Sequence, residues 1–327
     1  MNYRTLGKTG WNVSDVSFGA WAVGGTWGPT DDQESMAAMN RAIDLGVNLF
    51  DTADVYGDGH SEQLIRTLLK DRKEDVKILT KAGRRLDPHV AEGYTAQNIE
   101  AFIDRSRENL GMDTLDLVQL HCPPTPVFYE PELFGALDDL VQRGKLRHWG
   151  VSVEKIEEGL KAMEYENCAS VQIILNPFRQ RPIEHFLPRA KEKNVGVVVR
   201  LPLSSGMLTG KLKRDTQFAP DDHRQFNREG AGFDKGETFS GVPYEVGLDA
   251  VESLRPLVSQ GMTMAQFSLR WILDQDGVSC TIPGGKRPDQ VEDNVAASDL
   301  PPLSAELHAK VREIYDRQIR AHVHDRW

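Results

Sequence analysis

A strand-then-helix alternation runs through most of this 327-residue chain. Short runs of Val, Ile and Leu recur, and between them lie longer stretches in which apolar residues return every three or four positions, as on one face of a helix. Strands that are apolar throughout are typical of parallel sheets covered on both faces, and parallel strands need a crossover, usually a helix, between them. The alternation therefore predicts an α/β fold built on a parallel sheet.

Eight apolar runs are candidates for the strands of this sheet. They lie at residues 16–18, 48–50, 76–80, 115–120, 148–151, 171–175, 195–199 and 278–282. Amphipathic stretches separate them, among others at residues 32–45, 61–69, 96–110, 131–141 and 183–193. Eight such strands favour a closed (β/α)8 TIM barrel over an open doubly wound sheet, because no strand candidate leads into the Gly-x-Gly-x-x-Gly turn of a dinucleotide-binding fold.

Three segments lie outside this alternation. Residues 1–15 carry two short strand patterns around a glycine-containing turn, which predicts an N-terminal β-hairpin that covers one barrel end. Residues 211–241 follow the seventh strand without a clear period and predict a long loop, either a lid or binding loop or a disordered insertion. Residues 303–327 predict an extra C-terminal helix, at about 304–319, and a tail. We expect residues 1–327 to form a single domain.

The composition narrows the classes of partner. A net charge of −10, with no block of Lys or Arg, argues against general binding of nucleic acid or of an anionic membrane, because both need a basic surface. Cys122, Cys168 and Cys280 are too scattered for a disulfide framework or a zinc site. No segment resembles a signal peptide or a membrane span. We expect a soluble, cytoplasmic protein without a bound metal that acts on a small molecule, and a homo-oligomer stays open.

Polar side chains interrupt the chain just after three neighbouring strand candidates. Asp51 and Tyr56 follow the second strand, Lys81 follows the third, and His121 follows the fourth. In a barrel of this kind the carboxyl ends of the strands meet at one mouth, where the active site lies. We therefore expect these four side chains to converge.

The four residue types have a coherent use in proton transfer. A free tyrosine has a pKa of about 10, and a neighbouring ammonium group such as that of Lys81 lowers it. Asp51 can pair with Lys81, and His121 can hydrogen-bond a carbonyl oxygen and orient it, so that Tyr56 gives its proton to that oxygen. Each residue also has an ordinary structural explanation, such as a turn aspartate or a buried histidine, but four coincidences at neighbouring strand ends would be needed.

Taken together, these motifs resemble those of the aldo-keto reductase superfamily over residues 3 to about 297. The resemblance rests on Tyr-Arg-x-Leu-Gly-Lys-Thr-Gly at residues 3–10, Phe-Gly-Ala-Trp at 18–21, the block at 51–57 followed by Gly-His-Ser-Glu at 59–62, Lys81, His121, and Gly-Val-Ser at 150–152. It implies that Asp51, Tyr56, Lys81 and His121 form the catalytic tetrad. In the family pattern Tyr56 is the proton donor in reduction and the acceptor in oxidation.

The resemblance also implies NADPH or NADP⁺ as the cofactor, with NADH less favoured. The positions that it assigns to the cofactor follow the later strands: Ser152, Gln172, Arg200, Leu203, Ser205, Gly206, Leu208, Gly210, Lys211, Gly284, Lys286, Arg287, Gln290, Asp293 and Asn294. Ser152 and Gln172 match positions that bind the nicotinamide carboxamide, and Lys286 and Arg287 match the site of the 2′-phosphate. Arg200 departs from the pattern, since the family commonly has an aromatic residue there, although a planar guanidinium can also stack on a ring.

The expected reaction reduces a small aldehyde or ketone to an alcohol, or oxidises an alcohol or sugar hydroxyl in reverse. Trp21, Trp27, Tyr56 and His121 are expected to line the substrate pocket. Two other functions stay open. One is an NADP(H)-binding regulatory or redox-sensing subunit with little turnover, and the other is a barrel lyase or isomerase in which Lys81 forms a Schiff base with its substrate.

Overall fold

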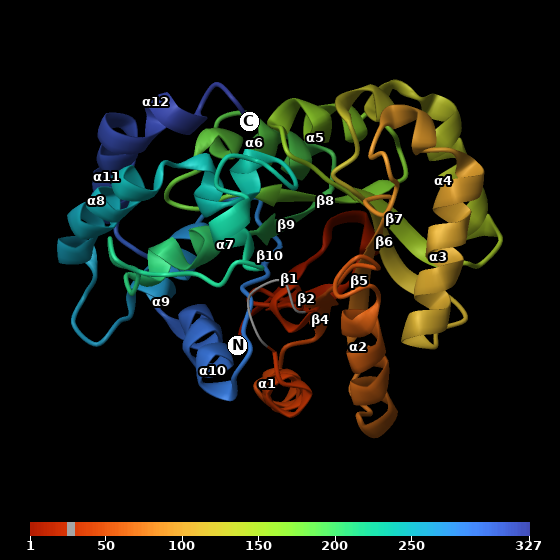
Figure 1. Ribbon diagram of the computed structural model, residues 1–327, viewed down its shortest axis with the longest axis horizontal. Coiled ribbons are helices and arrows are strands. Elements are labelled where there is room, and N and C mark those ends of the chain that lie inside the picture. Colours follow the sequence, from red (N-terminus) through yellow and green to blue (C-terminus); the bar gives the residue numbers. More distant parts are fainter. Residues whose placement is uncertain (25–29) are drawn as a thin grey trace.

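The computed structural model describes residues 1–24 and 30–327, and its centre is a parallel sheet of eight strands (Figure 1). Sheet order follows chain order, so every connection steps to the adjacent strand, as in a barrel. The strands are β3 (Phe18–Gly19), β4 (Leu49–Asp51), β5 (Lys77–Ala82), β6 (Leu115–His121), β7 (Leu146–Ser152), β8 (Cys168–Ile174), β9 (Gly196–Arg200) and β10 (Cys280–Thr281).

The two edges of this sheet meet and close the barrel. Gly19 pairs with Gly284 in a parallel bridge, and the main-chain N–H of Ser17 donates to the oxygen of Thr281 at 2.8 Å. The approach leaves no room for a side chain at Gly19, since a Cβ there would lie 2.6 Å from the oxygen of Ile282. The predicted (β/α)8 barrel is confirmed.

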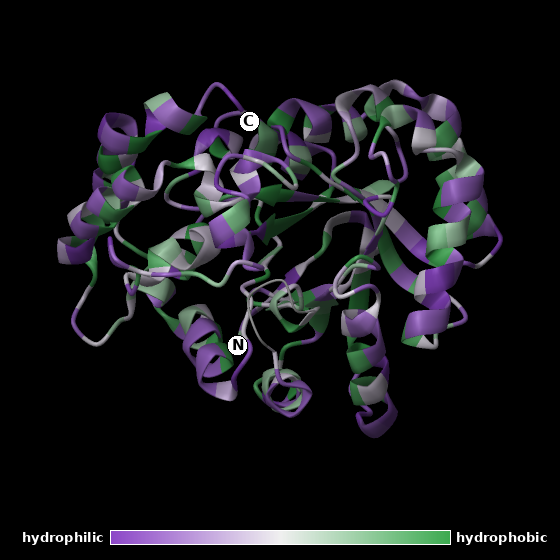
Figure 2. Ribbon diagram, viewed as in Figure 1, coloured by the Kyte–Doolittle hydropathy of each residue, from purple (hydrophilic) through white to green (hydrophobic). Residues whose placement is uncertain are grey.

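The strands are apolar because both of their faces are covered. Every residue of β6, β8 and β9 is buried. Figure 2 shows hydrophobic residues along the central strands, whereas the surrounding helices alternate between hydrophobic and hydrophilic residues. This is the burial pattern that continuous Val, Ile and Leu runs predict for parallel strands.

Helices surround the barrel, and most of them bury one face, whereas α9 is buried almost throughout. Those that follow the strands are α1 (Asp32–Asp44), α2 (His60–Asp71), α3 (Ala96–Leu110), α4 (Pro131–Gln142), α5 (Ile156–Ala162), α6 (Phe186–Glu192), α8 (Tyr244–Leu254), α9 (Met264–Leu273) and α10 (Pro288–Ala296). Local signals set their ends. Helix α3 begins where the Thr95 side chain accepts from the N–H of Asn98, and it ends at Gly111, whose φ is 66°. Among the described residues, no helix is long and apolar enough to cross a membrane.

The N-terminal hairpin lies at the amino end of the barrel, as predicted. Its strands β1 (Tyr3–Thr5) and β2 (Asn12–Ser14) pair antiparallel. Leu6 and Val13 belong to one buried cluster with residues of β4, β5, β6, β9 and β10. Between the two strands, Gly7 touches the main chain of Gly196, the first residue of β9. The hairpin therefore covers the end of the barrel opposite the candidate active site.

Residues 211–241, which we call the mouth segment, form the long connection predicted after the seventh barrel strand. They contain one short helix, α7 (His223–Phe226), and 3₁₀ turns at Lys235–Glu237 and Phe239–Gly241. Further along, α11 (Ala305–Ile314) continues through a π-helical turn at Tyr315–Ile319 into α12 (Arg320–Val323), so the predicted C-terminal helix runs longer than expected. Helix α11 lies beside α8 in Figure 1, and the π-helical turn also contacts α8.

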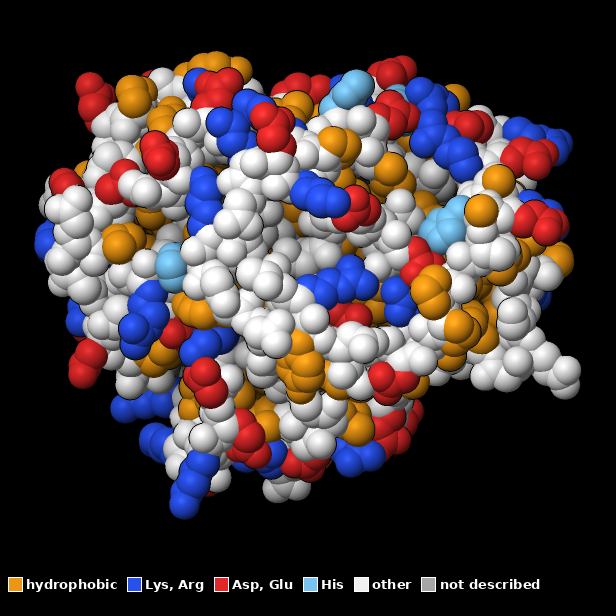
Figure 3. Space-filling view, turned by 180° about the vertical axis from the view of Figure 1, so that it is seen from behind, with side chains coloured by type: hydrophobic (Ala, Val, Ile, Leu, Met, Phe, Trp, Pro, Cys, Tyr) orange, Lys and Arg blue, Asp and Glu red, His pale blue; other side chains and the backbone are white. Residues whose placement is uncertain are grey.

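The outer surface carries charges of both signs. In the view of Figure 3, Lys and Arg side chains lie beside Asp and Glu side chains over much of the face, with hydrophobic groups between them. Many of these are exposed ion pairs, such as that of Lys310 with Glu306 at 2.6 Å. Exposed pairs of this kind add about 1 kcal/mol or less to stability, so the apolar core carries most of the fold.

Candidate active site

The four predicted catalytic residues lie at the carboxyl ends of three adjacent strands. Asp51 is the last residue of β4, His121 is the last residue of β6, and Lys81 lies one residue before the end of β5. Tyr56 follows in the turn after β4, where its N–H donates to the oxygen of Ala53 at 3.1 Å. The parallel register of the strands therefore brings together residues that are far apart in the chain, such as Asp51 and His121, which are separated by 70 positions.

The Lys81 ammonium group is the centre of this arrangement. Its Nζ lies 2.8 Å from a carboxylate oxygen of Asp51, 2.8 Å from the main-chain oxygen of Thr52 and 3.3 Å from the hydroxyl of Tyr56. An ammonium group has three N–H donors, and all three are used here. Lys81 is 1% exposed, so its charge acts in a site from which water is largely excluded.

Two amide side chains behind the ion pair hold the Asp51 carboxylate in place. Nε2 of Gln172 donates to Oδ1 of Asp51 at 2.7 Å and to Oε1 of Gln119 at 3.1 Å. Gln119 in turn donates to the hydroxyl of Ser170 at 2.9 Å. Gln172 was expected to contact a nicotinamide, and here its amide N–H groups are directed to Asp51 and Gln119. The supporting role of Gln119 has no sequence signal beyond a polar residue inside an apolar strand.

Burial shifts the protonation of the site. It raises the pKa of Asp51 and lowers that of Lys81, and the ion pair between them opposes both shifts. Burial, with the nearby Asp51 and Glu237 charges, raises the pKa of Tyr56 well above its usual range. The net shift is therefore opposite to the lowered pKa that was expected, because burial and the neighbouring carboxylates outweigh the cations around Tyr56. Tyr56 holds its proton at neutral pH.

His121 is the second group that faces Tyr56. The two rings meet edge to face, with centroids 5.8 Å apart. Burial and the positive charges of Arg84 and Lys81 lower the pKa of His121 well below its usual value, so the imidazole is neutral. Its Nδ1 is buried and has no hydrogen-bond partner among the described residues. Such an atom can accept or donate a hydrogen bond when a ligand enters.

Aromatic rings from two parts of the chain cover the Tyr56 side of the mouth. Trp21 stacks on Tyr56 with centroids 6.0 Å apart, and it also lies beside His223 at 4.9 Å and Phe233 at 6.0 Å. His223 and Phe233 belong to the mouth segment, and the only residue of that segment that the sequence named was Lys211, as a cofactor contact. The predicted pocket residue Trp27 lies outside the described residues.

Four charged side chains on the other side of the mouth, two of them buried and two half-buried, form a second network, which we call the ionic cluster. Its members are Arg84, Glu154, Arg200 and Glu237. Arg200 at the end of β9 lies 3.1 Å from Glu154 and 3.1 Å from Glu237, and Arg84 lies 3.2 Å from Glu154. Glu237 comes from the mouth segment and contacts both arginines. Only Arg200 was predicted as a site residue, since the other three follow no motif.

The carboxyl groups of this cluster differ in proton affinity. Burial and the neighbouring Glu237 charge raise the pKa of Glu154 to about 8. Burial also tends to raise the pKa of Glu237, but the charges of Arg84 and Arg200 hold that pKa well below its usual range. Glu237 is therefore the permanently charged partner of the two arginines.

The chain just after β9 is hydrogen-bonded to the mouth segment. It forms a 3₁₀ helix over Ser204–Thr209 in which Ser204 and Ser205 have positive φ values of 49° and 55°. The Ser205 hydroxyl accepts from the N–H of Phe239 at 3.0 Å and donates to the oxygen of Glu237 at 3.3 Å. Leu203, Gly206, Leu208, Gly210 and Lys211, also predicted to contact the cofactor, belong to or flank this helix.

The predicted phosphate site lies where β10 leads into α10. Oε1 of Gln290 accepts from the N–H of Lys286 at 2.8 Å, and Nδ2 of Asn294 donates to the oxygen of Gly284 at 3.2 Å, so both side chains fix this turn. Asp293 instead accepts from Gln266 at 2.8 Å and thus contacts α9.

Two cations flank this turn, and a third reaches it from the mouth segment. Arg287 is exposed and paired with Asp289 at 3.1 Å. Burial and the nearby charge of Arg224 lower the pKa of Lys286. Arg224 belongs to α7 of the mouth segment, and no sequence motif pointed to it.

The residues at the mouth fit a nicotinamide dinucleotide. Besides His121, Nε of Arg200 and the hydroxyl of Ser204 are buried without hydrogen-bond partners in the part of the chain that the structure describes. Buried polar atoms are rarely left unpaired, so these atoms indicate a polar ligand at the strand ends. The cations near the start of α10 lie where a barrel commonly binds phosphate.

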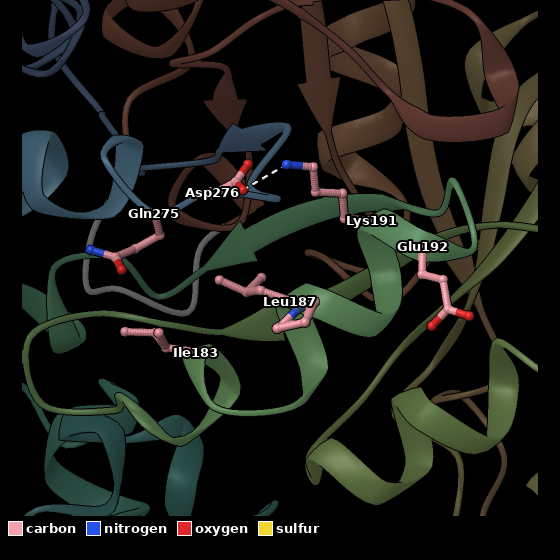
Figure 4. Close-up of a pocket in the computed structure, with 7 residues that line it drawn as sticks. Ile183, Leu187, Lys191, Glu192, Gln275 and Asp276 are labelled. Carbon is pink, nitrogen blue, oxygen red and sulfur yellow. Dashed lines mark hydrogen bonds and ion pairs between the residues drawn. The ribbon is translucent and has the colours of Figure 1, made fainter.

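A separate pocket lies on the flank of the barrel (Figure 4). Its lining comes from α6 and the segments around it, with Ile183 and Leu187 on one side and Gln275 and Asp276 on the other. An ion pair of Lys191 with Asp276 at 2.7 Å crosses its rim. It contains none of the predicted catalytic or cofactor residues, so the candidate active site is the strand-end arrangement described above.

Comparisons with known proteins agree with this geometry. The family model for the aldo/keto reductase family matches residues 15–316. The chain is 30% identical to the aldo-keto reductase YhdN of Bacillus subtilis over 89% of its own length and 87% of that protein. It is 31% identical to a putative voltage-gated potassium channel subunit beta of Schizosaccharomyces pombe, over 95% of this chain and 92% of that one.

Solved structures lead to the same family. The structure of the glycerol dehydrogenase AKR11B4 from Gluconobacter oxydans aligns with a TM-score of 0.78 and 30% identity, covering 97% of this chain and 96% of that chain. A barrel of the right topology, a converging tetrad and a family match over nearly the whole chain lead to one conclusion. This chain belongs to the aldo/keto reductase family.

Proposed function

We propose that this protein is an NADP(H)-dependent oxidoreductase that interconverts a small carbonyl compound and its alcohol, with Tyr56 as the proton donor and acceptor. One observation carries the proposal: the Lys81 ammonium group donates hydrogen bonds both to the Asp51 carboxylate and to the Tyr56 hydroxyl. Because Lys81 donates to the tyrosine oxygen, the tyrosine proton is free to point toward a substrate. Buried and neutral, Tyr56 is poised to give up that proton only as negative charge develops on a bound oxygen.

In the reducing direction the chain's own residues manage the proton. The bound cofactor would supply the hydride to the carbonyl carbon and leave in its oxidised form. Neutral His121 hydrogen-bonds the carbonyl oxygen and directs it to Tyr56, whose hydroxyl proton moves to that oxygen. The Lys81 ammonium then stabilises the resulting phenolate, and Asp51 keeps the ammonium charged and in place. The alcohol is released after Tyr56 regains a proton from solvent.

The cofactor would lie from the ends of β7 to β9 to the start of α10. Ser152 and Arg200 are the polar groups at the nicotinamide end, and Lys286 and Arg287 would hold the 2′-phosphate that distinguishes NADPH from NADH. Asp293 is a weaker candidate for a cofactor contact than the sequence indicates, since it is already bonded to α9. Arg224 is a further candidate for the phosphates because its charge reaches Lys286.

The substrate pocket would be formed by Trp21, Tyr56 and His121, together with His223 and Phe233 of the mouth segment. Aromatic walls suit both aldehydes and sugar rings. Among the relatives reported above, one is named a glycerol dehydrogenase, which favours including polyols in a substrate panel.

A regulatory role is the second candidate, because one of the relatives reported above is named a putative channel subunit beta. The complete tetrad and its intact hydrogen bonds favour turnover instead. Schiff-base chemistry at Lys81 finds less support, since all three of its N–H donors are engaged and an ammonium group is not a nucleophile.

The test is the loss of absorbance at the reduced-nicotinamide band, measured with NADPH and with NADH against a panel of aldehydes, ketones and sugars, and in reverse with polyols. Turnover that favours NADPH is expected. Tight binding of NADPH without turnover on any member of the panel would support the regulatory role, and absence of both would reject the proposal.

A further inference from the structure

Trp327 is a large side chain far along the sequence from the tetrad, yet it packs against the mouth segment. It is 7% exposed, and its indole Nε1 donates to Oδ1 of Asp234 at 2.8 Å. The guanidinium of Arg179 lies over the indole ring, 4.3 Å from its centre, and Arg181 donates to the main-chain oxygen of Trp327 at 2.9 Å. The side chain is thus fixed on several sides.

Two glycines of the mouth segment are shaped to receive this ring. A Cβ at Gly236 would lie 2.8 Å from Cε2 of Trp327, and one at Gly241 would lie 2.6 Å from Cη2. Gly241 also has a φ of 77°, which disfavours other residues. The indole therefore packs directly on main chain, and a larger residue at either glycine would have to push the segment away.

The same contact fixes the turn that carries Glu237. Oδ1 of Asp234, the acceptor for the indole, also accepts from the N–H of Gly236 at 2.6 Å, and the N–H of Glu237 donates to the main-chain oxygen of Asp234 at 3.0 Å. Asp234 is thus shared between the Trp327 side chain and the 3₁₀ turn. Displacing the indole would remove the contact that holds the Asp234 end of this turn, and would leave the Glu237 end to Ser205 and the two arginines.

Glu237 then links this turn to the barrel mouth. Its carboxylate lies 3.1 Å from Arg200 and 2.5 Å from Arg84, and the Glu237 charge is among those that raise the pKa of Tyr56. A continuous set of contacts therefore runs from Trp327 through Asp234 and Glu237 to the charges around the tetrad.

We propose that Trp327 is a positioning residue for the active-site mouth, which seats the 234–241 stretch so that Glu237 bridges Arg84 and Arg200. The effect on catalysis rests on the function proposed above, whereas the effect on the segment does not. Trp327 does not touch the reacting atoms and acts only through Glu237.

Hydrogen exchange of the intact protein tests the structural part. The Trp327→Ala variant is expected to raise exchange at residues 234–241 by about tenfold or more relative to the wild type, with β5 and β6 unchanged. Trp327→Phe keeps the stacking and loses the bond to Asp234, so an intermediate rise is expected. Tyr315→Phe is the control, because it removes a different buried hydrogen bond of the C-terminal segment, that to His324 at 2.8 Å, and leaves the indole and its bond to Asp234 in place. Unchanged exchange at 234–241, or an equal rise over the whole chain, overturns the proposal.

Kinetics tests the catalytic part through a double-mutant cycle. Trp327→Ala and Glu237→Gln are each expected to lower kcat/KM by about tenfold, and the double variant no further than the more damaging single one, because both act through the same bridge. Additive losses would overturn the coupling. If the wild type itself shows no turnover, the proposed function fails, and the exchange measurement still decides whether Trp327 seats the segment.

Discussion

The tetrad and the ionic cluster lie at the same end of the barrel but are assembled differently. The tetrad comes from three adjacent strands and the turn after β4, and its one ion pair, Asp51 with Lys81, is supported by amide and main-chain groups. The cluster draws its four charges from the loop after β5, the chain after β7, the end of β9 and the mouth segment. The register of the parallel strands brings the tetrad together, whereas the ionic cluster forms because the mouth segment folds back over the strand ends.

Because the two networks are built differently, we expect the tetrad to govern proton transfer and the ionic cluster to govern how the mouth segment is held. The barrel fixes the tetrad, so its geometry does not depend on the mouth segment. Glu237 is the partner that comes from the mouth segment, and without it Arg84 and Arg200 would share Glu154 alone. Changes in the cluster should therefore affect stability and closure of the mouth, and changes in the tetrad should affect proton transfer.

The largest effect on stability is expected for Glu237→Ala. Removing one partner from a buried charge network leaves the others uncompensated, which typically costs about 3–5 kcal/mol. Urea unfolding should show this loss. Glu157→Ala is the control, since Glu157 pairs with Arg181 at the surface and should cost about 1 kcal/mol or less. Equal losses in the two variants would show that the cluster is no more important than a surface pair.

A smaller, pH-dependent effect on stability is expected at Asp54, which lies in the turn between β4 and Tyr56. Asp54 is fully buried, and both of its carboxyl oxygens lack hydrogen-bond partners among the described residues. Burial and the nearby Glu62 charge raise its pKa to about 7, although the charges of Arg85 and Arg105 lower it. The folded protein thus holds a proton that the unfolded chain has released above pH ~4. Stability should fall as pH rises from about 4 to about 7.

Asp54→Asn should remove this dependence. Below pH ~4 the variant and the wild type should be equally stable, and above pH ~7 the variant should be more stable, by on the order of 4 kcal/mol. Urea midpoints measured across this pH range give the difference. A variant that is less stable at pH 8 would mean that Asp54 is ionised and paired in the folded protein.

The smallest effect concerns cofactor choice rather than either network. Replacing Lys286 and Arg287 together with Ala should weaken NADPH binding by roughly 10- to 100-fold, as expected for loss of about 1.5–3 kcal/mol of charged hydrogen bonding, and should leave NADH binding nearly unchanged. Fluorescence titration with both cofactors measures the ratio. Equal losses for the two would place the 2′-phosphate elsewhere, with Arg224 the next candidate.

Much of the fold and of the tetrad could be predicted from sequence, because both follow from local patterns. Strand and helix periods predicted the barrel, and Asp51, Lys81 and His121 stand where apolar runs end. Glu154 and Glu237 carry no such signal, since their meeting depends on how residues 211–241 fold back. The direction of the Tyr56 pKa shift also differs from the expectation, because burial is a property of the packed site and cannot be deduced from neighbours in the chain.

The central claim is that Tyr56 passes the proton, and the most direct test is the turnover of Tyr56→Phe measured beside its affinity for NADPH. The account predicts a fall in kcat on the order of 10²- to 10⁴-fold with an unchanged Kd for the cofactor, since only the hydroxyl is removed. Turnover close to that of the wild type would contradict it.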